Sequence, residues 1–204
     1  MIKIALPKGR LFEESVELLL KKGVIKEPLK EGRKLVVEKN GFTFFLVKPF
    51  DVPVYVESGV VDAGICGYDV FLERKPKVYR VLDLGIGFCK IAVAGKPESK
   101  EKYFNSTHIT LATKYPSIAY EFFKSKGIKA TIYHLNGSVE LAPLVGLAEF
   151  ILDLVQTGKT LKENGLVIIE EITTSTAWLV VNKESFRIKN EAILELIQKL
   201  KKES

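Results

Sequence analysis

The sequence predicts an α/β protein folded as two lobes. Short apolar runs alternate along the chain with amphipathic stretches, a pattern typical of α/β domains with mostly parallel strands. The units fall into two clusters, and strand-like crossings near residues 84–95 and 174–182 join them. Lobe I is therefore predicted at residues 1–89 plus 180–204 and lobe II at residues 90–179. A cleft between the lobes is the natural place for a ligand.

Local signals define the elements of lobe I. Gly23 ends an amphipathic helix whose apolar residues share one face, and Asn40-Gly41 separates two β-rich runs as the turn of a hairpin. In chain order we expect a strand at 2–6, a helix at 11–23, a hairpin at 33–49, a short helix at 51–59, a strand at 61–67, a helix at 68–74 and a strand at 79–85.

Lobe II continues the alternation. Pro116 suits the first turn of a helix that Gly127 ends. Strands are expected at 90–95, 108–113, 129–135, 149–155, 166–172 and 175–182, and helices at 116–127 and 138–146, with a loop and helix at 157–165. A last helix at 190–204 returns to lobe I and ends in lysines, which suits the helix dipole.

Composition narrows the function classes. The 204 residues carry a net charge of +6, but lysine-rich segments also contain glutamate, and no basic stripe is interleaved with aromatics. Nucleic-acid binding is therefore only a minor alternative. Two histidines, and Cys66 and Cys89 in separate apolar contexts, lack metal-ligand spacing, which argues against a zinc site. The chain starts directly with a strand-like run and has no apolar segment of membrane-spanning length, so we expect a cytoplasmic protein without a membrane partner.

The stretch `ILDLVQTGKTLKENGL`, residues 151–166, contains a Gly-Lys-Thr that is typical of nucleotide-binding P-loops. A P-loop needs its first glycine at position 153, where this chain has Asp153. A carboxylate there would repel a triphosphate, which argues against a P-loop NTPase.

An anion site remains in view, because a turn that opens a helix offers backbone N–H groups and hydroxyls to a phosphate monoester. Asp153, a few residues earlier, is placed to accept hydrogen bonds from the hydroxyls of an attached sugar. Together these groups suit ribose 5-phosphate. An ordinary strand–turn–helix connection with threonine as N-cap is about as well supported. The residues of this 157–160 loop are Thr157, Gly158, Lys159 and Thr160.

The loop resembles the phosphoribosyl-pyrophosphate loop of phosphoribosyltransferases, with one acid where the nucleobase-salvage branch commonly has two. An ordered set of further stretches, which includes `ALPKGRLFEESVELL`, `DVPVYVESGVVDAGICGYDVFLE`, `NGSVELAPLVGLAEF` and `STAWLVVN`, resembles ATP phosphoribosyltransferase from Ile2 to about Asn190. This resemblance implies a two-lobed fold similar to type II periplasmic binding proteins, with mixed sheets and helices on both faces.

The resemblance also implies the reaction and the partners. ATP and phosphoribosyl pyrophosphate give phosphoribosyl-ATP and pyrophosphate, in the first step of histidine biosynthesis. Mg²⁺ is expected on the pyrophosphate. The chain ends where longer members of the family continue into a regulatory domain, so it is similar to the short form. That form is expected to be a dimer within a hetero-oligomer, beside a regulatory subunit resembling histidyl-tRNA synthetase.

Cationic side chains are expected near the phosphates in lobe I. Lys8, Gly9 and Arg10 follow the first strand in a loop that opens a helix, and they suit a di- or triphosphate; a surface turn is the alternative. Arg33 and Lys48 match cationic positions of the family near the pyrophosphate and the ATP phosphates. Position 48 is often arginine in relatives, and lysine cannot form the same bidentate fork.

The remaining candidates are acids and aromatic residues. Asp153 is expected to bind the ribose hydroxyls and the 157–160 loop the 5-phosphate. Glu140 is a second candidate for the sugar or for Mg²⁺, with a helix-surface acid as the alternative. Asp69 is a candidate on the adenine side, with a helix N-cap as the alternative. Tyr68 and Tyr115 can stack on a base, but packing at the core or rim is the safer expectation.

Catalysis by such a site rests on alignment and charge. N1 of adenine has a free lone pair, so the reaction needs no general base, and the catalytic roles are assigned to Lys8, Arg33, Lys48 and Asp153. The competing hypothesis is a non-catalytic solute-binding or sensor domain of the same architecture. The phosphate loop argues for the enzyme, because a binding protein for small solutes has no need of it.

Overall fold

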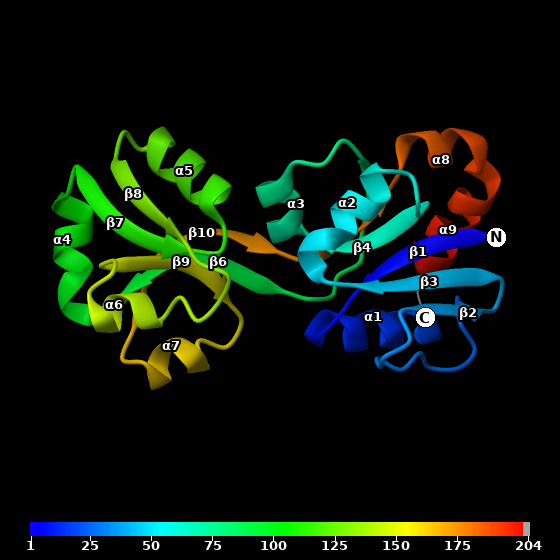
Figure 1. The fold of residues 1–204 in the computed structure, drawn as a ribbon, viewed down its shortest axis with the longest axis horizontal. Helices are drawn as coiled ribbons and strands as arrows, with labels where there is room; N and C mark the ends of the chain where they lie inside the picture. The colour runs from blue at the N-terminus through cyan, green and yellow to red at the C-terminus, as the bar shows by residue number, and fades with distance from the viewer. Residues whose placement is uncertain (202–204) are drawn as a thin grey trace. The chain divides into compact units, whose positions relative to one another are not determined.

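The computed structural model describes residues 1–201, which form two compact units. Unit 1 contains residues 1–87 and the described residues from Thr176 onward, and unit 2 contains residues 88–175 (Figure 1). The expected lobes were divided at 89 and 179 instead. The difference arises because Cys89 pairs with Ser175 in the sheet of unit 2, whereas Ala177 pairs with Gly67 in the sheet of unit 1.

Unit 1 is built on a mixed sheet of six described strands in the order β2-β3-β1-β4-β11-β5. β1 runs parallel to β3 and β4, while β2 and β11 are antiparallel to their neighbours. The strands are β1 (Ile2–Pro7), β2 (Val36–Lys39), β3 (Phe42–Val47), β4 (Ala63–Gly67), β5 (Tyr79–Asp83) and β11 (Ala177–Val181).

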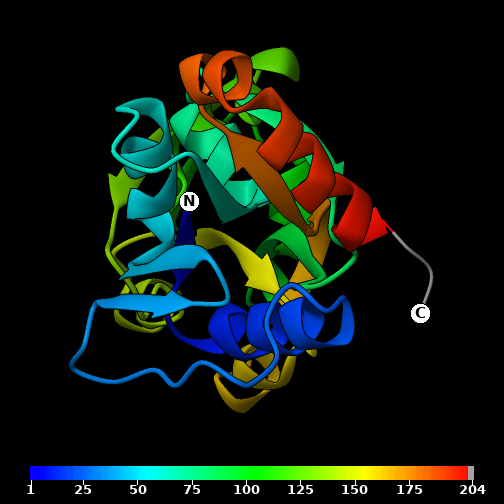
Figure 2. The same cartoon turned by 90° about the vertical axis from the view of Figure 1, so that its right-hand side faces the viewer.

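Helices cover both faces of this sheet (Figure 2). On one face α1 (Arg10–Lys21) and α9 (Asn190–Lys201) pack on a core that includes Ile4, Leu6 and Leu179. On the other, α2 (Val52–Glu57) and α3 (Tyr68–Arg74) pack on Ala5 and Val180. A 3-10 turn, Pro49–Asp51, precedes α2, and α8 (Lys183–Ile188) precedes α9.

Unit 2 is built on a mixed sheet of five described strands in the order β10-β6-β9-β7-β8. β7 runs parallel to β8 and β9, and β6 is antiparallel to β9 and β10. The strands are β6 (Cys89–Gly95), β7 (His108–Thr113), β8 (Lys129–His134), β9 (Phe150–Val155) and β10 (Val167–Ser175).

Helices also cover both faces of the second sheet (Figure 1). α6 (Leu141–Val145) and α7 (Lys159–Glu163) share an apolar cluster with Ala92 and Ile151. On the opposite face the Tyr103 ring of α4 (Lys100–Asn105) lies edge-on to Phe150, at 5.2 Å, and contacts Phe123 of α5 (Pro116–Ser125). A 3-10 turn, Pro97–Ser99, precedes α4.

The predicted α/β class, the mixed sheets and the helices on both faces are confirmed. The expectation of mostly parallel pairing is wrong, because β2, β6, β10 and β11 all pair antiparallel. Two short helices, α4 and α8, were not expected; Asn182 caps α8 by accepting a hydrogen bond from the Ser185 N–H at 2.9 Å. The last helix is described to residue 201, and the rest of the expected range lies outside the described residues. The cleft between the lobes stays a prediction.

Candidate functional site

The 157–160 loop connects β9 to the short helix α7. Gly158 has φ of 74°, in the left-handed region, so its lack of a side chain lets the chain turn here. Gly158, rather than a threonine, occupies the N-cap position, and the Thr157 hydroxyl accepts only a long hydrogen bond, at 3.4 Å, from the Lys159 N–H. Thr157, Lys159 and Thr160 are exposed, so their polar groups are available to a ligand.

Asp153 lies within β9, where it pairs with Ala92 of β6. Its side chain is half-buried, and its Oδ1 accepts a hydrogen bond from the Leu154 N–H at 2.8 Å. This contact to the adjacent backbone limits the rotation of the carboxylate. The sheet therefore holds the acid in the strand that leads directly into the loop.

The segment that contains Glu140 follows β8 and lies at the same edge of the sheet as the 157–160 loop. β7, β8 and β9 are parallel, so their carboxyl ends lie at one edge of the sheet. The 157–160 loop follows β9, and Glu140 follows β8. Val139, next to Glu140, packs in the same apolar cluster as Val155 and Leu161, which flank the loop. Glu140 itself is half-buried directly before α6 and makes no side-chain cap hydrogen bond there.

The segment after β7 reaches the same edge, and sequence reasoning named only Tyr115 from it. The buried Thr113 hydroxyl donates to the Leu152 carbonyl of β9 at 2.7 Å and accepts from the Tyr115 N–H at 2.9 Å. Lys114 lies between these residues at the carboxyl end of β7. The sequence signal for Lys114 was its position between a strand and a helix that begins with Pro116. Tyr115 is buried, as the packing alternative predicted.

The cationic candidates of unit 1 also lie at or beside the carboxyl edge of their sheet. β1 runs parallel to both β3 and β4, so the carboxyl ends of the three strands lie at one edge of the sheet. The residues that follow these ends are Lys8, Lys48 and Tyr68. The Lys8 N–H donates to the Val47 carbonyl at 2.8 Å, which joins the two lysine-bearing segments. Arg33 reaches this edge from the loop before β2, because the Leu46 N–H bonds to the Leu35 carbonyl.

Gly9 opens α1 with φ of 82° and ψ of −150°, a conformation that only glycine adopts readily. Its N–H donates to a carboxylate oxygen of Glu31 at 2.9 Å. Arg10, exposed at the start of α1, lies 3.9 Å from Glu14. The contact with Glu31 joins residues that are 22 positions apart, and sequence reasoning did not find it.

Asp69 is buried in the first turn of α3, at 7% exposure. The N-cap position belongs to Gly67, so the N-cap alternative for Asp69 is wrong. Oδ1 of Asp69 folds back over Gly67, where it would lie 2.4 Å from an added Cβ. Burial, followed by the negative charge of Asp69, raises the pKa of the Cys66 thiol at the end of β4. The acid therefore sits at the end of the strand.

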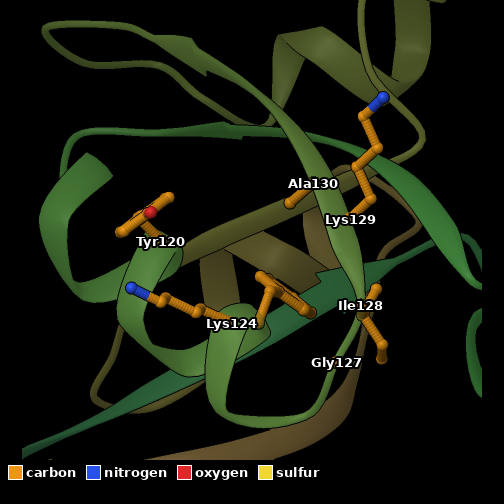
Figure 3. Close-up of a pocket in the computed structure, with 7 residues that line it drawn as sticks. Tyr120, Lys124, Gly127, Ile128, Lys129 and Ala130 are labelled. Carbon is orange, nitrogen blue, oxygen red and sulfur yellow. The ribbon is translucent and has the colours of Figure 1, made fainter.

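Three further observations concern the rest of the described residues. Within residues 1–201, no group of three or more His, Cys, Asp or Glu side chains is placed to hold a metal ion. A cavity of about 370 Å³ lies between α5 and the beginning of β8, with Tyr120 and Lys124 on one side and Lys129 and Ala130 on the other (Figure 3). None of the predicted site residues lines it. None of the helices in residues 1–201 has the length and apolarity needed to cross a membrane.

Comparisons with known proteins agree on one family. The family model described as ATP phosphoribosyltransferase (HisG) matches residues 48–202. An ATP phosphoribosyltransferase from Aquifex aeolicus is 74% identical over 200 residues, which cover 98% of this chain and 94% of the relative.

Solved structures extend the agreement to the fold. A chain of the ATP phosphoribosyl transferase (HisG:HisZ) complex from Thermotoga maritima has a TM-score of 0.83 at 37% identity, covering 98% of this chain and 96% of the other. The periplasmic aliphatic sulphonate binding protein SsuA from Escherichia coli has a TM-score of 0.62 at 10% identity, covering 98% and 67%. The second likeness concerns the fold alone, and it confirms the predicted similarity to type II periplasmic binding proteins.

Proposed function

Since the chain belongs to the ATP phosphoribosyltransferase family, we propose that each of its two sheets binds one substrate at its carboxyl edge. The enzyme transfers the phosphoribosyl group of phosphoribosyl pyrophosphate to N1 of the ATP adenine and releases pyrophosphate, in the first step of histidine biosynthesis. The alternative of a non-catalytic solute-binding or sensor domain is not favoured, because the binding-protein likeness is confined to the fold.

Unit 2 binds phosphoribosyl pyrophosphate in this proposal. The observation that carries it is the position of Asp153 in the strand that leads into an exposed Thr-Gly-Lys-Thr loop, with the Glu140 segment packed beside it. Residues 157–160 bind the 5-phosphate through hydroxyls and backbone N–H groups, and Asp153 accepts hydrogen bonds from the ribose hydroxyls. Lys159 occupies the variable position of the motif, so its side chain has a lesser role.

Unit 1 binds ATP in this proposal. Lys8, Arg10, Arg33 and Lys48 supply the positive charge for the phosphates; all four are half-buried or exposed at the carboxyl edge of the sheet or in the loop beside it. The Gly9 backbone admits close approach of an anion. Asp69 serves the adenine side, since its carboxylate lies at the end of β4.

The chemistry is a substitution at the anomeric carbon. The lone pair of adenine N1 forms the new C–N bond while the C–O bond to pyrophosphate breaks and its electrons leave with the pyrophosphate. No proton has to be removed from N1, so the protein contributes alignment and charge. Mg²⁺ carried by phosphoribosyl pyrophosphate would supply positive charge to the leaving group. Glu140 is the candidate protein ligand for this ion, and oxygen donors suit Mg²⁺.

A second type of chain completes the proposal. The relative from Thermotoga maritima was solved as a HisG:HisZ complex, which supports a hetero-oligomer for this chain as well. We expect a dimer of this chain within that assembly, with a regulatory subunit that resembles histidyl-tRNA synthetase. We expect the protein to act in the cytoplasm, because it uses ATP for biosynthesis.

Release of pyrophosphate tests the proposal directly. The chain is incubated with Mg²⁺, ATP and phosphoribosyl pyrophosphate, and then with each substrate omitted. Pyrophosphate and a phosphoribosylated ATP in equal amounts are expected only when both substrates are present. Pyrophosphate from one substrate alone would contradict the transfer, and a product attached at another adenine nitrogen would contradict the role of N1. The assay is repeated with a regulatory subunit to measure how far activity depends on it.

A further inference from the structure

An exposed arginine on the edge strand β5, Arg80, lies against three aromatic rings. The guanidinium carbon of Arg80 lies 4.1 Å from the ring centroid of Trp178, 4.4 Å from that of Tyr68 and 5.5 Å from that of Phe71. The Tyr68 ring lies 6.4 Å from both Phe71 and Trp178. Arg80 therefore joins α3 to β11 through contacts between a cation and ring faces.

Strand register explains why these side chains meet. β11 runs between β4 and β5, and Val180 of β11 pairs with Arg80. Trp178, two residues earlier in β11, points to the same face as Val180 and pairs with Cys66 of β4. Tyr68 follows β4 and begins α3, and its N–H donates to the Thr176 carbonyl at 2.8 Å. The Arg80 guanidinium thus lies where β5, β11 and the start of α3 converge.

Among residues 1–201, the side chain of Arg80 has no carboxylate partner and makes no hydrogen bond. The ring contacts are consequently its interactions with the rest of the unit. Arginine suits this role because its planar, weakly hydrated cation stacks on aromatic faces. α3 has only seven residues, and a helix so short takes its orientation from packing rather than from its own hydrogen bonds.

We infer that Arg80 is a positioning residue for ATP: by holding Tyr68 and Trp178 it fixes the first turn of α3 and so the carboxylate of Asp69. The inference rests on the proposed role of Asp69 on the adenine side. Asp69 is the residue next to Tyr68, and its carboxylate is folded back against Gly67 at the end of β4. A small rotation of the first helical turn would move that carboxylate away from the sheet edge.

The test compares Arg80→Leu and Arg80→Lys with the matched control Arg74→Leu. Arg74 is the last residue of α3, the helix that Arg80 contacts, and its guanidinium carbon lies 5.6 Å from the centroid of a single ring, that of Phe50. Arg80→Leu should raise the KM for ATP about threefold to fivefold, the range expected for cation–ring contacts of an exposed arginine, and leave the KM for phosphoribosyl pyrophosphate within about twofold. Arg80→Lys should restore most of the ATP affinity, because it keeps a cation over the rings. The control should change neither KM.

Trp178 is the chain's single tryptophan, so its fluorescence reports whether the rings have been released. Arg80→Leu should shift the emission, and the control should not. A shifted emission with both KM values unchanged, or changed by the same factor, would show a structural role only and would overturn the inference. If Arg80→Leu does not fold, Tyr68→Leu is measured against the same criteria.

Asp69→Asn separates this inference from the proposed function. If Asp69→Asn leaves the KM for ATP unchanged, the adenine-side role of Asp69 fails, and the inference fails with it. If Asp69→Asn raises this KM and Arg80→Leu does not, only the inference fails. Positioning through Asp69 predicts that Arg80→Leu adds little in the Asp69→Asn background, whereas independent effects would multiply.

Discussion

The carboxylate of Asp62 accepts two hydrogen bonds from the ammonium of Lys189, both at 2.9 Å, between residues 127 positions apart. Asp62 is buried directly before β4, and Lys189 lies between α8 and α9. The same carboxylate also accepts hydrogen bonds from the Lys3 N–H and the Ser185 hydroxyl, each at 2.8 Å. This buried acid therefore attaches the last two helices to the sheet of unit 1.

Asp62→Asn should lower the free energy of unfolding by about 1–3 kcal/mol. The amide cannot neutralise the Lys189 ammonium, and it replaces one of the two acceptor oxygens of the carboxylate with an NH₂ group. Because Lys189 is partly exposed, the expected loss in the free energy of unfolding lies toward the lower end of this range. Burial alone raises the pKa of Asp62, but the hydrogen bonds outweigh it and hold the pKa below its ordinary value. The stabilisation is therefore complete above about pH 5 and is lost as the pH falls through the lowered pKa.

Urea unfolding of the wild type and of Asp62→Asn between pH 3 and pH 7 measures both effects. The difference between the two proteins should shrink toward low pH. A difference that stays constant with pH would contradict the ionic role. Glu195→Gln on the exposed face of α9 serves as the control, because its partner Lys199 is one turn away on the same helix.

Tyr103→Phe should destabilise unit 2 by about 1 kcal/mol. The buried Tyr103 hydroxyl donates to Glu170 of β10 at 2.5 Å, and the Lys126 ammonium donates to the same carboxylate. The substitution removes the hydroxyl and leaves the ring packing and the Lys126 contact in place. Thermal unfolding measures the change, with Tyr133→Phe on the exposed edge strand β8 as the control. Equal shifts in the two variants would argue against the hydrogen bond.

Asp153→Asn should raise the KM for phosphoribosyl pyrophosphate or lower turnover by about tenfold or more, because an amide is a poorer acceptor for two ribose hydroxyls. Thr160→Val should mainly weaken binding of the same substrate. Steady-state kinetics measures both, with Glu171→Gln, an exposed residue of β10 in the same unit, as the control. A change of less than a few-fold for Asp153→Asn would argue against the diol role.

Gly67→Ala should weaken ATP binding with little effect on stability. The backbone of Gly67, at φ of −60°, accepts alanine, but the new Cβ would lie 2.4 Å from Oδ1 of Asp69 and displace that carboxylate. Gly64→Ala is the contrasting variant, because its Cβ would meet Val52 at 2.7 Å and Val56 at 2.9 Å in the core, at a cost of about 1–3 kcal/mol. Binding titrations and urea unfolding of both variants should show opposite patterns.

Glu31→Gln should lower the KM for ATP by about twofold to threefold at low ionic strength. Its carboxylate bonds to the Gly9 N–H beside Lys8 and Arg10, where the proposal places phosphates, and a negative charge there repels them. The gain should fade in high salt as charges are screened. Kinetics at two ionic strengths measures it. An increase in KM would show instead that Glu31 supports the loop that binds the nucleotide.

The order of the elements could be read from the sequence because each is encoded locally. Hydrophobic period, glycine ends and the Asn40-Gly41 turn located the strands and helices of both units. The short helices α4 and α8 were not predicted, although Asn182, three residues before Ser185, was a local capping signal for α8. Pairing direction was harder, since β10 and β11 join their sheets antiparallel through contacts with strands far away in the chain.

The candidate site also has one part that is encoded locally and another that depends on tertiary contacts. The spacing from Asp153 to Thr160 lies within one strand–turn–helix segment, so the sequence by itself determined the Thr-Gly-Lys-Thr turn that we propose as the phosphate loop and, with the family motifs, the reaction. Only the tertiary structure decided that Glu31 bonds to Gly9, that Arg80 lies against rings from α3 and β11, and that Lys189 neutralises Asp62. The physical reason is that these contacts depend on strand order and on the burial of apolar faces, which residues close together in the chain do not specify.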